Sequence, residues 1–310
     1  MPEAPLSLSI AVGAYPHTQA LKSGRIASAE LRLEFAEISP INRAFAPMVR
    51  ERRFDVCEMA IGTFLQAKTY GKELTLLPIA MAARFQESAL LCRADSAIRG
   101  PADLAGRRVG VRAYSQTTGL WLRGLLSDDY GVRPEDVQWM TFEGAHVLEY
   151  ADPPFVERAA PGKDLLKMLR ERELDAVIVG NDVPEDPELR TVFPDPAAAA
   201  EAFWNRHRFV PINHMIVVRR EIAIDRPDAI RQLCRLFVAS KAAAAPEPSE
   251  RDRAPMGREA VEPSVALALR LAGEQGLLPR PLSLEEVWEG CPEKYLWGGE
   301  YFDISERGSV

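Results

Sequence analysis

The sequence predicts an α/β protein made of two lobes that are joined by two crossing strands. Two short apolar strand patterns support this, because residues 53–59 and 106–111 each lead into a turn rich in glycine or hydroxyl residues and then into a helix. Two further apolar segments, 86–92 and 210–217, are placed to cross between the halves. In open α/β sheets ligands bind at the carboxyl ends of strands. The pattern therefore predicts a ligand cleft between the two lobes.

Strands and helices alternate through the first part of the chain. Alternating or buried apolar runs predict strands at 6–12, 30–37, 55–59 and 74–79. Helices are expected between them at 17–23, 42–52 and 63–70. Pro40 stands where a proline at the first helical position would, and Gly71 ends the third helix. The order is that of a βαβαβ unit.

The same alternation continues in the middle of the chain. We expect strands at 89–93, 108–112, 137–142, 175–179 and 210–219. We expect helices at 101–104, 117–128, 163–172 and 196–207, with Tyr130 and Gly131 ending the second of them.

The remainder is predicted to be helical, at 227–244, 260–275 and 284–289, around an exposed loop at 245–256 that is rich in proline and charge. The aromatic residues Tyr295, Trp297, Tyr301 and Phe302 are expected to pack back on a lobe. With two crossings, the expected lobes are residues 1–86 with 215–310, and residues 87–214. The chain has 310 residues, which is enough for two separate cores.

Charge and cysteine usage exclude several classes of partner. The formal net charge of -7 argues against nucleic acid or an anionic membrane as the main partner, and no apolar run approaches membrane-spanning length. A small anionic ligand stays compatible, because the local field in a cleft decides its binding. The cysteines are far apart and form no CxxC pair, so we expect reduced thiols. They are Cys57, Cys92, Cys234 and Cys291.

The N-terminal region indicates a first strand, because the apolar run at 6–12 lacks a preceding basic segment and is followed at once by Gly13. From this we expect no export signal and a cytoplasmic location. That expectation favours an enzyme over the binding protein of an importer. Whether the chain assembles with copies of itself is left open.

Arginines and hydroxyl residues near strand ends are candidates for binding an anion. Arg112 directly follows an apolar strand, and Arg84 is placed similarly, so either could clamp a carboxylate. Ser115, Thr117 and Thr118 lie where a strand turns into a helix, a place that suits either helix capping or anion binding by free N–H groups. For Arg53 and Arg123 a structural role is favoured.

Two histidines and one buried carboxylate are candidates for acid–base chemistry. His214 lies on the returning strand at the expected hinge, and His17 follows the first strand. Either can hold a proton near neutral pH, although a hydrogen-bonded core histidine is the ordinary alternative. Glu58 ends a buried strand and is a candidate for a general acid with a raised pKa, a helix cap, or an acceptor for a ligand hydroxyl. His146, in a loop, has a less defined place, and His207 is expected to be structural.

No metal or nucleotide motif accompanies these residues. The sequence contains no HxH or HExxH spacing and no GxGxxG or Walker pattern. We therefore expect neither a tightly bound metal nor a nucleotide, and no cofactor.

Several motifs over residues 6–219 resemble one family. They are Gly13-Ala14-Tyr15 with Thr18, Phe54 to Met59, Arg84-Phe85, Gly106 to Val111, Trp121 to Gly124 with Tyr130-Gly131-Val132, and Pro211-Ile212-Asn213-His214. With these motifs the chain resembles the 4,5-dihydroxyphthalate decarboxylases, which are cofactor-independent aromatic decarboxylases on the type 2 periplasmic-binding-protein fold.

The resemblance implies that Tyr15 and Thr18 contact the substrate, and it strengthens His214 as a candidate. The chain departs from the family pattern at Ala14, Pro16 and His17, where an aspartate and an arginine are expected, and at Gln86-Glu87 in place of Arg-His. These departures leave open another aromatic or cyclic carboxylate as the substrate.

The expected reaction is protonation of the ring carbon that bears the leaving carboxylate. His214 or His17 would donate the proton, Arg84 and Arg112 would hold carboxylates, and Glu58 would accept from a ring hydroxyl. Two alternatives stay open at this point. One is a solute-binding protein for an aromatic carboxylate, and the other is a different lyase on the same fold, similar to the menaquinone-pathway enzymes that act on carboxylated rings.

Overall fold

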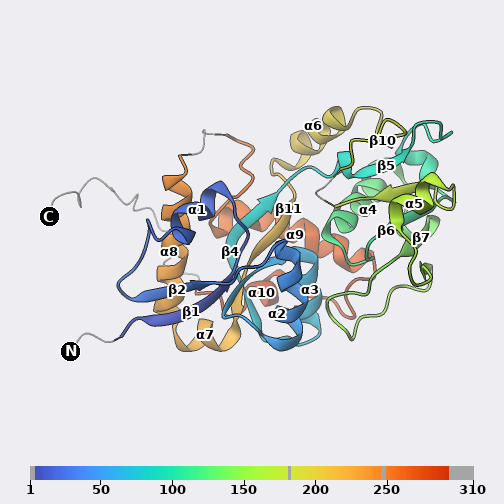
Figure 1. Ribbon diagram of the computed structural model, residues 1–310. Coiled ribbons are helices and arrows are strands. Elements are labelled where there is room, and N and C mark those ends of the chain that lie inside the picture. Colours follow the sequence, from blue (N-terminus) through green and yellow to red (C-terminus); the bar gives the residue numbers. More distant parts are fainter. Residues whose placement is uncertain (1–3, 181–182, 246–248, 293–310) are drawn as a thin grey trace.

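Two β-sheets form the frame of the protein in the computed structural model, which describes residues 4–180, 183–245 and 249–292. Figure 1 shows the sheets side by side, each with helices packed around it. The first sheet has five strands in the order β2-β1-β3-β11-β4. Their bounds are β1 Leu6–Ala11, β2 Leu31–Phe35, β3 Val56–Ala60, β4 Leu74–Ala83 and β11 Ile212–Arg219.

The second sheet has six strands in the order β10-β5-β9-β6-β7-β8. Its central strands β9, β6, β7 and β8 are parallel, while β5 is antiparallel to both β9 and β10. Their bounds are β5 Leu90–Arg93, β6 Arg108–Val111, β7 Gln138–Thr141, β8 Val156–Arg158, β9 Ala176–Ile178 and β10 Leu189–Thr191.

The chain passes between the sheets twice, after β4 and before β11. The two passing segments are bonded to each other, since the Arg84 amide donates to the Pro211 carbonyl at 3.0 Å. Beside this bond the Gln86 side chain donates to Asn213 Oδ1 at 2.7 Å. In the first sheet β11 runs antiparallel between β3 and β4, so that both connections lie next to one another. The expected pair of crossing strands is therefore present.

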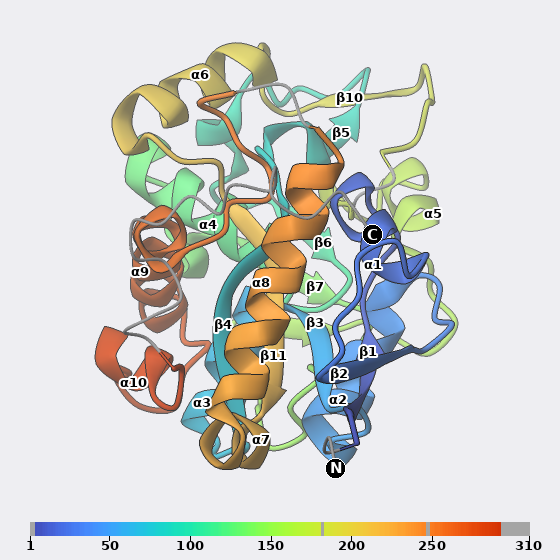
Figure 2. The same cartoon turned by 90° about the vertical axis from the view of Figure 1, so that its left-hand side faces the viewer.

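Burial decides the composition of the central strands. All five residues of β3 are buried, because the strand lies in the middle of its sheet with helices on both faces. Figure 2 shows α8, Pro227–Ala243, running across one face of the first sheet. On the other face α2, Phe45–Glu51, contacts β3, and α3, Ile61–Thr69, contacts β3, β4 and β11.

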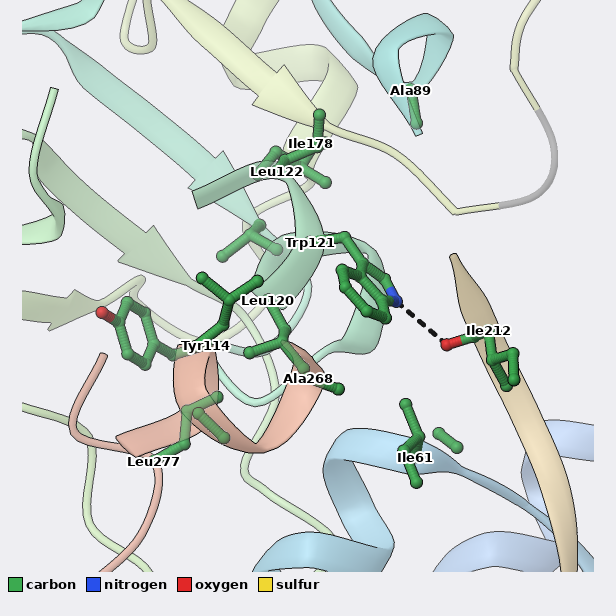
Figure 3. Packing of buried hydrophobic residues seen from close by; sticks show 14 of the residues in the cluster. Ile61, Ala89, Tyr114, Leu120, Trp121, Leu122, Ile178, Ile212, Ala268 and Leu277 are labelled. Atoms are coloured by element: carbon green, nitrogen blue, oxygen red, sulfur yellow. Dashed lines mark hydrogen bonds between the residues drawn. The ribbon is translucent and has the colours of Figure 1, made fainter. Parts of the chain in front are cut away.

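Helices α3, α4 and α9 join the two sheets through one core. Helix α9, Arg258–Glu274, contacts both α3 and α4, Thr117–Tyr130. Figure 3 shows Ile61, Leu120 and Ala268 from these three helices, with Trp121 donating to the Ile212 carbonyl at 2.9 Å. Helix α4 can approach α9 because Gly124 lacks a side chain; a Cβ there would lie 2.4 Å from Leu271 Cδ1.

Capping signals mark the ends of several other helices. The Asp195 side chain accepts from the Ala198 amide at the start of α6, and Ser283 with Glu286 forms a capping box at α10. Gly131, with φ of 66°, ends α4 as the sequence predicted. The bounds are α1 Gln19–Lys22, α5 Leu165–Arg170, α6 Pro196–His207, α7 Arg220–Asp225 and α10 Leu284–Trp288.

Some details differ from the sequence prediction. The strands β8 and β10 and the helix α7 were not expected, because each is short and partly exposed, with little periodicity. Pro40 precedes a 3-10 turn at Ile41–Ala44, and α2 begins only at Phe45.

The expected packing of Tyr295, Trp297, Tyr301 and Phe302 concerns residues outside those that the structure describes.

Cys57, Cys92, Cys234 and Cys291 form no disulfide. Among the described helices, none has the length and apolar character needed to cross a bilayer.

We predict that Trp121→Phe weakens the packing of α4, which belongs to the second sheet's half, against β11 of the first sheet. The substitution removes the indole N–H and leaves the buried Ile212 carbonyl without that donor, which should cost about 1–3 kcal/mol of unfolding free energy in urea titrations. Trp139→Phe is the matched control, because its indole donates to Pro134 within the second sheet's own region. Both variants should lose stability, but only Trp121→Phe should also weaken ligand binding. Equal ligand affinity in both variants would contradict a role in holding the two sheets together.

Candidate functional site

A cavity of about 230 Å³ lies between the two sheets, at the carboxyl ends of their parallel strands. The first sheet contributes residues that follow β3 or begin β11, and α2 adds Phe45 to the same wall. The second sheet contributes the loops that follow β6, β7 and β9. The position predicted from the sequence, between two groups of strand ends, is where the cavity is found.

His214 and Glu58 form a bonded pair at the first wall. The Glu58 carboxylate and His214 Nδ1 are 2.7 Å apart, joining adjacent strands β3 and β11. The His214 side chain is 15% exposed and lines the cavity, whereas Glu58 is fully buried behind it. Because Nδ1 is occupied by Glu58, Nε2 is the ring nitrogen left to exchange a proton with a ligand.

Three donors converge on the Glu58 carboxylate. Besides His214, the Tyr15 hydroxyl donates to Oε1 at 2.6 Å, and the Gly13 amide donates to Oε2 at 2.9 Å. Burial by itself would raise the pKa of Glu58, but the bonds from His214, Tyr15 and Gly13 outweigh it and lower the pKa. The carboxylate is thus kept ionised inside the protein.

This placement corrects the expected role of Glu58. The sequence suggested a carboxyl group with a raised pKa that faces the cleft. In the structure the Glu58 side chain is instead fully buried behind His214, and its pKa is lowered. It can orient His214 and hold a proton on Nδ1, but it is not among the residues that line the cavity.

Tyr15 and Thr18 belong to the support of Glu58. The Thr18 hydroxyl donates to the Gly13 carbonyl at 2.9 Å and accepts from the Tyr15 amide at 2.9 Å, which fixes the turn after β1. Thr18 is fully buried, and neither residue lines the cavity. Both residues thus support Glu58 from behind the cavity wall, and the substrate contacts implied by the resemblance stay a prediction. Gly13 is needed there, because a Cβ would lie 2.6 Å from the Tyr15 ring.

His17 lies outside the cavity. Its ring stacks on the Tyr15 ring, with centroids 5.1 Å apart and an interplanar angle of 3°. Burial lowers the pKa of His17, and Glu58 partly opposes that change. The Tyr15 ring separates His17 from Glu58 and His214, so the expected role of His17 as a proton donor is not supported by its position.

The second wall is the turn from β6 into α4, as the sequence predicted. Ser115, Thr117 and Thr118 are nearly buried and line the cavity. The expected side-chain capping of α4 is absent, because Gln116 occupies the cap without such a bond, while Thr117 Oγ1 accepts from the Gly62 amide at 3.2 Å. The first amides of an α-helix have no acceptor within the helix and carry partial positive charge. This turn therefore offers N–H and O–H donors to an anion.

The two candidate arginines differ in position. Arg112 lines the cavity, and its Nη1 donates to Glu143 Oε2 at 2.9 Å. Arg84 does not line it; its guanidinium donates to Thr118 Oγ1 at 3.0 Å and to the Gly180 carbonyl at 3.2 Å from behind the wall. Arg84 thus positions Thr118, and the expectation that it lines the pocket is wrong.

His146 is a cavity residue to which the sequence assigned no role. It lies in the loop after β7, and its Nδ1 is 2.9 Å from the Thr63 hydroxyl of α3. Burial, followed by the positive charges of Arg112 and Arg50, lowers the pKa of His146 to about 4. The signal that could have revealed it is its place just beyond a strand of the parallel sheet, where binding residues gather.

Other candidates from the sequence have structural places. Arg123 is buried in the core, where it donates to Gln275 and to the Tyr114 carbonyl and stacks over the Tyr114 ring. Arg53 is exposed, outside the cavity. His207 packs against Phe203 and Phe209.

A larger hollow of about 540 Å³ lies at the edge of the second sheet, around Ser96 to Arg99 and Arg190. Its lining residues include no histidine or carboxylate, and Arg190 donates to backbone carbonyls of Ser96 and Ile98. We therefore place the site in the smaller cavity. Within the described part of the chain, no group of His, Cys, Asp and Glu is arranged to hold a metal ion.

Comparisons with known proteins agree with this architecture. No family profile matches the sequence. The chain is 29% identical over 288 residues to the 4,5-dihydroxyphthalate decarboxylase of Comamonas testosteroni, covering 87% of this chain and 85% of that one. It is 29% identical over 214 residues to the enzyme of the same name from Pseudomonas putida, covering 64% and 81%. The resemblance predicted from the sequence motifs is confirmed.

Solved structures share the fold at low sequence identity. The periplasmic aliphatic sulphonate binding protein SsuA of Escherichia coli aligns with a TM-score of 0.59 and 15% identity, covering 93% of this chain and 99% of that one. The desulfurization enzyme DszB aligns with a TM-score of 0.52 and 14% identity, covering 91% and 96%. The expected two-lobed fold of the periplasmic-binding-protein type is confirmed, and the fold occurs in both a binding protein and an enzyme.

We predict that His146 titrates near pH 4. A folded-state pKa below the ordinary value of about 6.5 means that the unfolded chain binds the proton more readily. The stability due to this difference is complete above pH 6.5 and is lost as the pH falls towards 4, by about 2–3 kcal/mol. Histidine NMR titrations and urea unfolding between pH 4 and 7 measure both effects.

His146→Asn is the matched variant, because it should remove one low-pKa resonance and flatten this part of the stability profile. A His146 midpoint near 6.5 would contradict the burial and charge argument.

Proposed function

We propose that the chain is a carbon–carbon lyase that decarboxylates a hydroxylated aromatic carboxylic acid, with His214 as the proton donor. The observation that carries this proposal is the pairing of His214 with the buried Glu58 on one wall of a cavity whose other wall offers donors to an anion. The similarity to two 4,5-dihydroxyphthalate decarboxylases supports the same reaction.

The anion-binding wall would hold the carboxylate that stays on the ring. Arg112 keeps guanidinium N–H groups besides the one bonded to Glu143, and an arginine can bind a carboxylate through two parallel bonds. The Ser115 to Thr118 turn adds hydroxyl groups and the first amides of α4. These donors come from one rigid strand–helix turn, so they can fix the ring in a single orientation.

The opposite wall would supply the proton. Glu58 keeps a proton on His214 Nδ1 and aims Nε2 at the cavity. The ring carbon takes the proton from Nε2, the bond to the leaving carboxylate breaks, and its electron pair restores the aromatic ring as CO2 departs. Edge contact with Phe45, at 5.1 Å between centroids, holds the imidazole plane in place.

The size of the cavity fits a ligand with a single ring. Pockets for drug-sized ligands enclose roughly 300–1,000 Å³, and this cavity of about 230 Å³ is smaller. Its lining includes Phe45, Ile41 and Ala60, which offer apolar contact to a ring face. A small aromatic carboxylate is therefore the proposed ligand, and 4,5-dihydroxyphthalate is the first substrate to test because the two relatives are named for it.

We predict CO2 release from 4,5-dihydroxyphthalate or a related hydroxylated acid, and a loss of turnover in His214→Gln. Removing the general acid should lower kcat by roughly 10²–10⁴-fold while leaving binding largely unchanged. His17→Gln is the control, since that ring lies behind Tyr15 and outside the cavity, and it should keep most activity.

Normal turnover in His214→Gln would remove His214 from the mechanism. Binding of these acids by the wild-type chain without any CO2 release would instead favour a solute-binding protein.

Arg112→Ala should weaken carboxylate binding. Loss of a charge-assisted pair should raise Kd by about 10–100-fold, equivalent to about 1.5–3 kcal/mol, in calorimetric titrations with an aromatic dicarboxylate. Arg108→Ala is the matched control from the other end of the same strand, where the guanidinium pairs with Asp175 away from the cavity. If the two variants bind equally, Arg112 does not contact the carboxylate.

A further inference from the structure

We infer that His146 is a second catalytic residue, the acceptor of the proton from the substrate's ring hydroxyl, acting opposite His214. The inference rests on the proposed function and assigns to His146 the role that the sequence had given to Glu58. Four features of the structure support it: the place of the ring in the cavity, its fixed orientation, its neutral state and its relation to His214.

The loop that carries His146 is hydrogen-bonded to a helix that packs on the first sheet. Arg50 of α2 donates from Nε to the His146 carbonyl at 2.9 Å and from Nη2 to the Ala145 carbonyl at 3.1 Å. On the same loop Glu149 pairs with Lys72 at 2.6 Å. His146 belongs to the second sheet's loops but contacts α3 through Thr63. The ring is thus held where groups from both sheets meet.

Both cavity histidines pack against the same phenyl ring. The Phe45 centroid lies 5.1 Å from that of His214 and 5.9 Å from that of His146, with interplanar angles of 86° and 84°. Both imidazoles therefore contact one aromatic side chain of the cavity wall. In the proposed complex a single bound ring faces His214 with one ring carbon and His146 with its hydroxyl group.

The charged surroundings of His146 keep it neutral. The charged groups that act on it are Arg112, on the cavity wall, and Arg50, on α2, and both are positive. Together with burial they lower the pKa of His146 to about 4, so the ring is an unprotonated acceptor at neutral pH. His214, by contrast, is bonded to a buried carboxylate.

The Thr63 hydroxyl allows His146 to accept and return a proton. A hydroxyl group can rotate to donate or to accept, so it can follow a change of tautomer while Nδ1 stays hydrogen-bonded. Nε2 is then free to take a proton from a ligand hydroxyl. The contact orients the ring without fixing its protonation state.

The reaction balances with these two residues and no other reactant. The carbon bearing the leaving carboxylate takes a proton from His214 and becomes tetrahedral, which makes the hydroxyl para to it strongly acidic. His146 takes that hydroxyl proton, and the oxygen's electrons move into the ring. The carbon–carbon bond then breaks, its electron pair restores the aromatic ring and leaves a phenolate, and CO2 departs. His146 returns its proton to that oxygen, and His214 regains one from water.

The test separates binding from turnover, with 3,4-dihydroxybenzoate as the binding probe because it is the product expected from 4,5-dihydroxyphthalate and keeps one carboxylate and both hydroxyls. His146→Gln should bind this probe with a Kd within about threefold of the wild type. Its kcat on the dihydroxy acid should fall by about 100-fold or more, because the hydroxyl proton has lost its acceptor.

Two further variants complete the test. Thr63→Val retains the imidazole but removes its partner, and should give a smaller loss of kcat than His146→Gln. His207→Gln should retain kcat, because that ring packs against Phe203 outside the cavity. The inference is overturned if folded His146→Gln turns over within about threefold of the wild type or loses binding and turnover in parallel. Failure of the proposed function is distinct, because the wild-type chain would then bind the probe yet release no CO2 from any dihydroxy acid tested.

Discussion

The buried carboxylate of Glu58 is the constraint on which the first wall of the site depends. An ionised group without exposure is costly unless it is fully hydrogen-bonded, and here three donors come from Gly13, Tyr15 and His214. Satisfying Glu58 fixes the turn after β1, the start of β11 and the plane of the His214 imidazole together. Thr18 and His17 then serve this arrangement by holding the turn and stacking on Tyr15.

The second constraint is the close approach of two strand–helix turns. Gly62 of α3 donates to Thr117 at the start of α4, and a Cβ at Gly62 would lie 3.1 Å from that hydroxyl and 3.3 Å from the Ser115 carbonyl. The absence of a side chain lets the carboxyl edges of the two sheets face each other directly. His214 and the anion donors therefore come from different sheets but meet in one small cavity.

The sequence predicted the parts of the site that depend on strand ends, and missed those that depend on contacts between distant segments. Arg112, the Ser115 to Thr118 turn and His214 could be placed from apolar strand patterns, and each lines the cavity. Glu58 was placed in the correct strand. Only the pairing of β3 with β11 shows that its carboxylate contacts His214 on the side away from the cavity. The side chains of Arg84 and Thr18 lie near the site but form hydrogen bonds to other protein groups outside the cavity. The position of His146 depends on a loop whose path has no periodic signal in the sequence. The short edge strands β8 and β10 were missed for the same lack of periodicity.

The most direct test of the account is a crystal structure of the chain with phthalate, which has both carboxylates but no hydroxyl to assist decarboxylation. The account predicts one carboxylate against Arg112 and the start of α4, and His214 Nε2 facing the ring carbon that carries the other. Glu58 should remain bonded to His214 Nδ1 without touching the ligand. A phthalate bound with His214 turned away from it, or held in the hollow beside Arg190, would contradict the account.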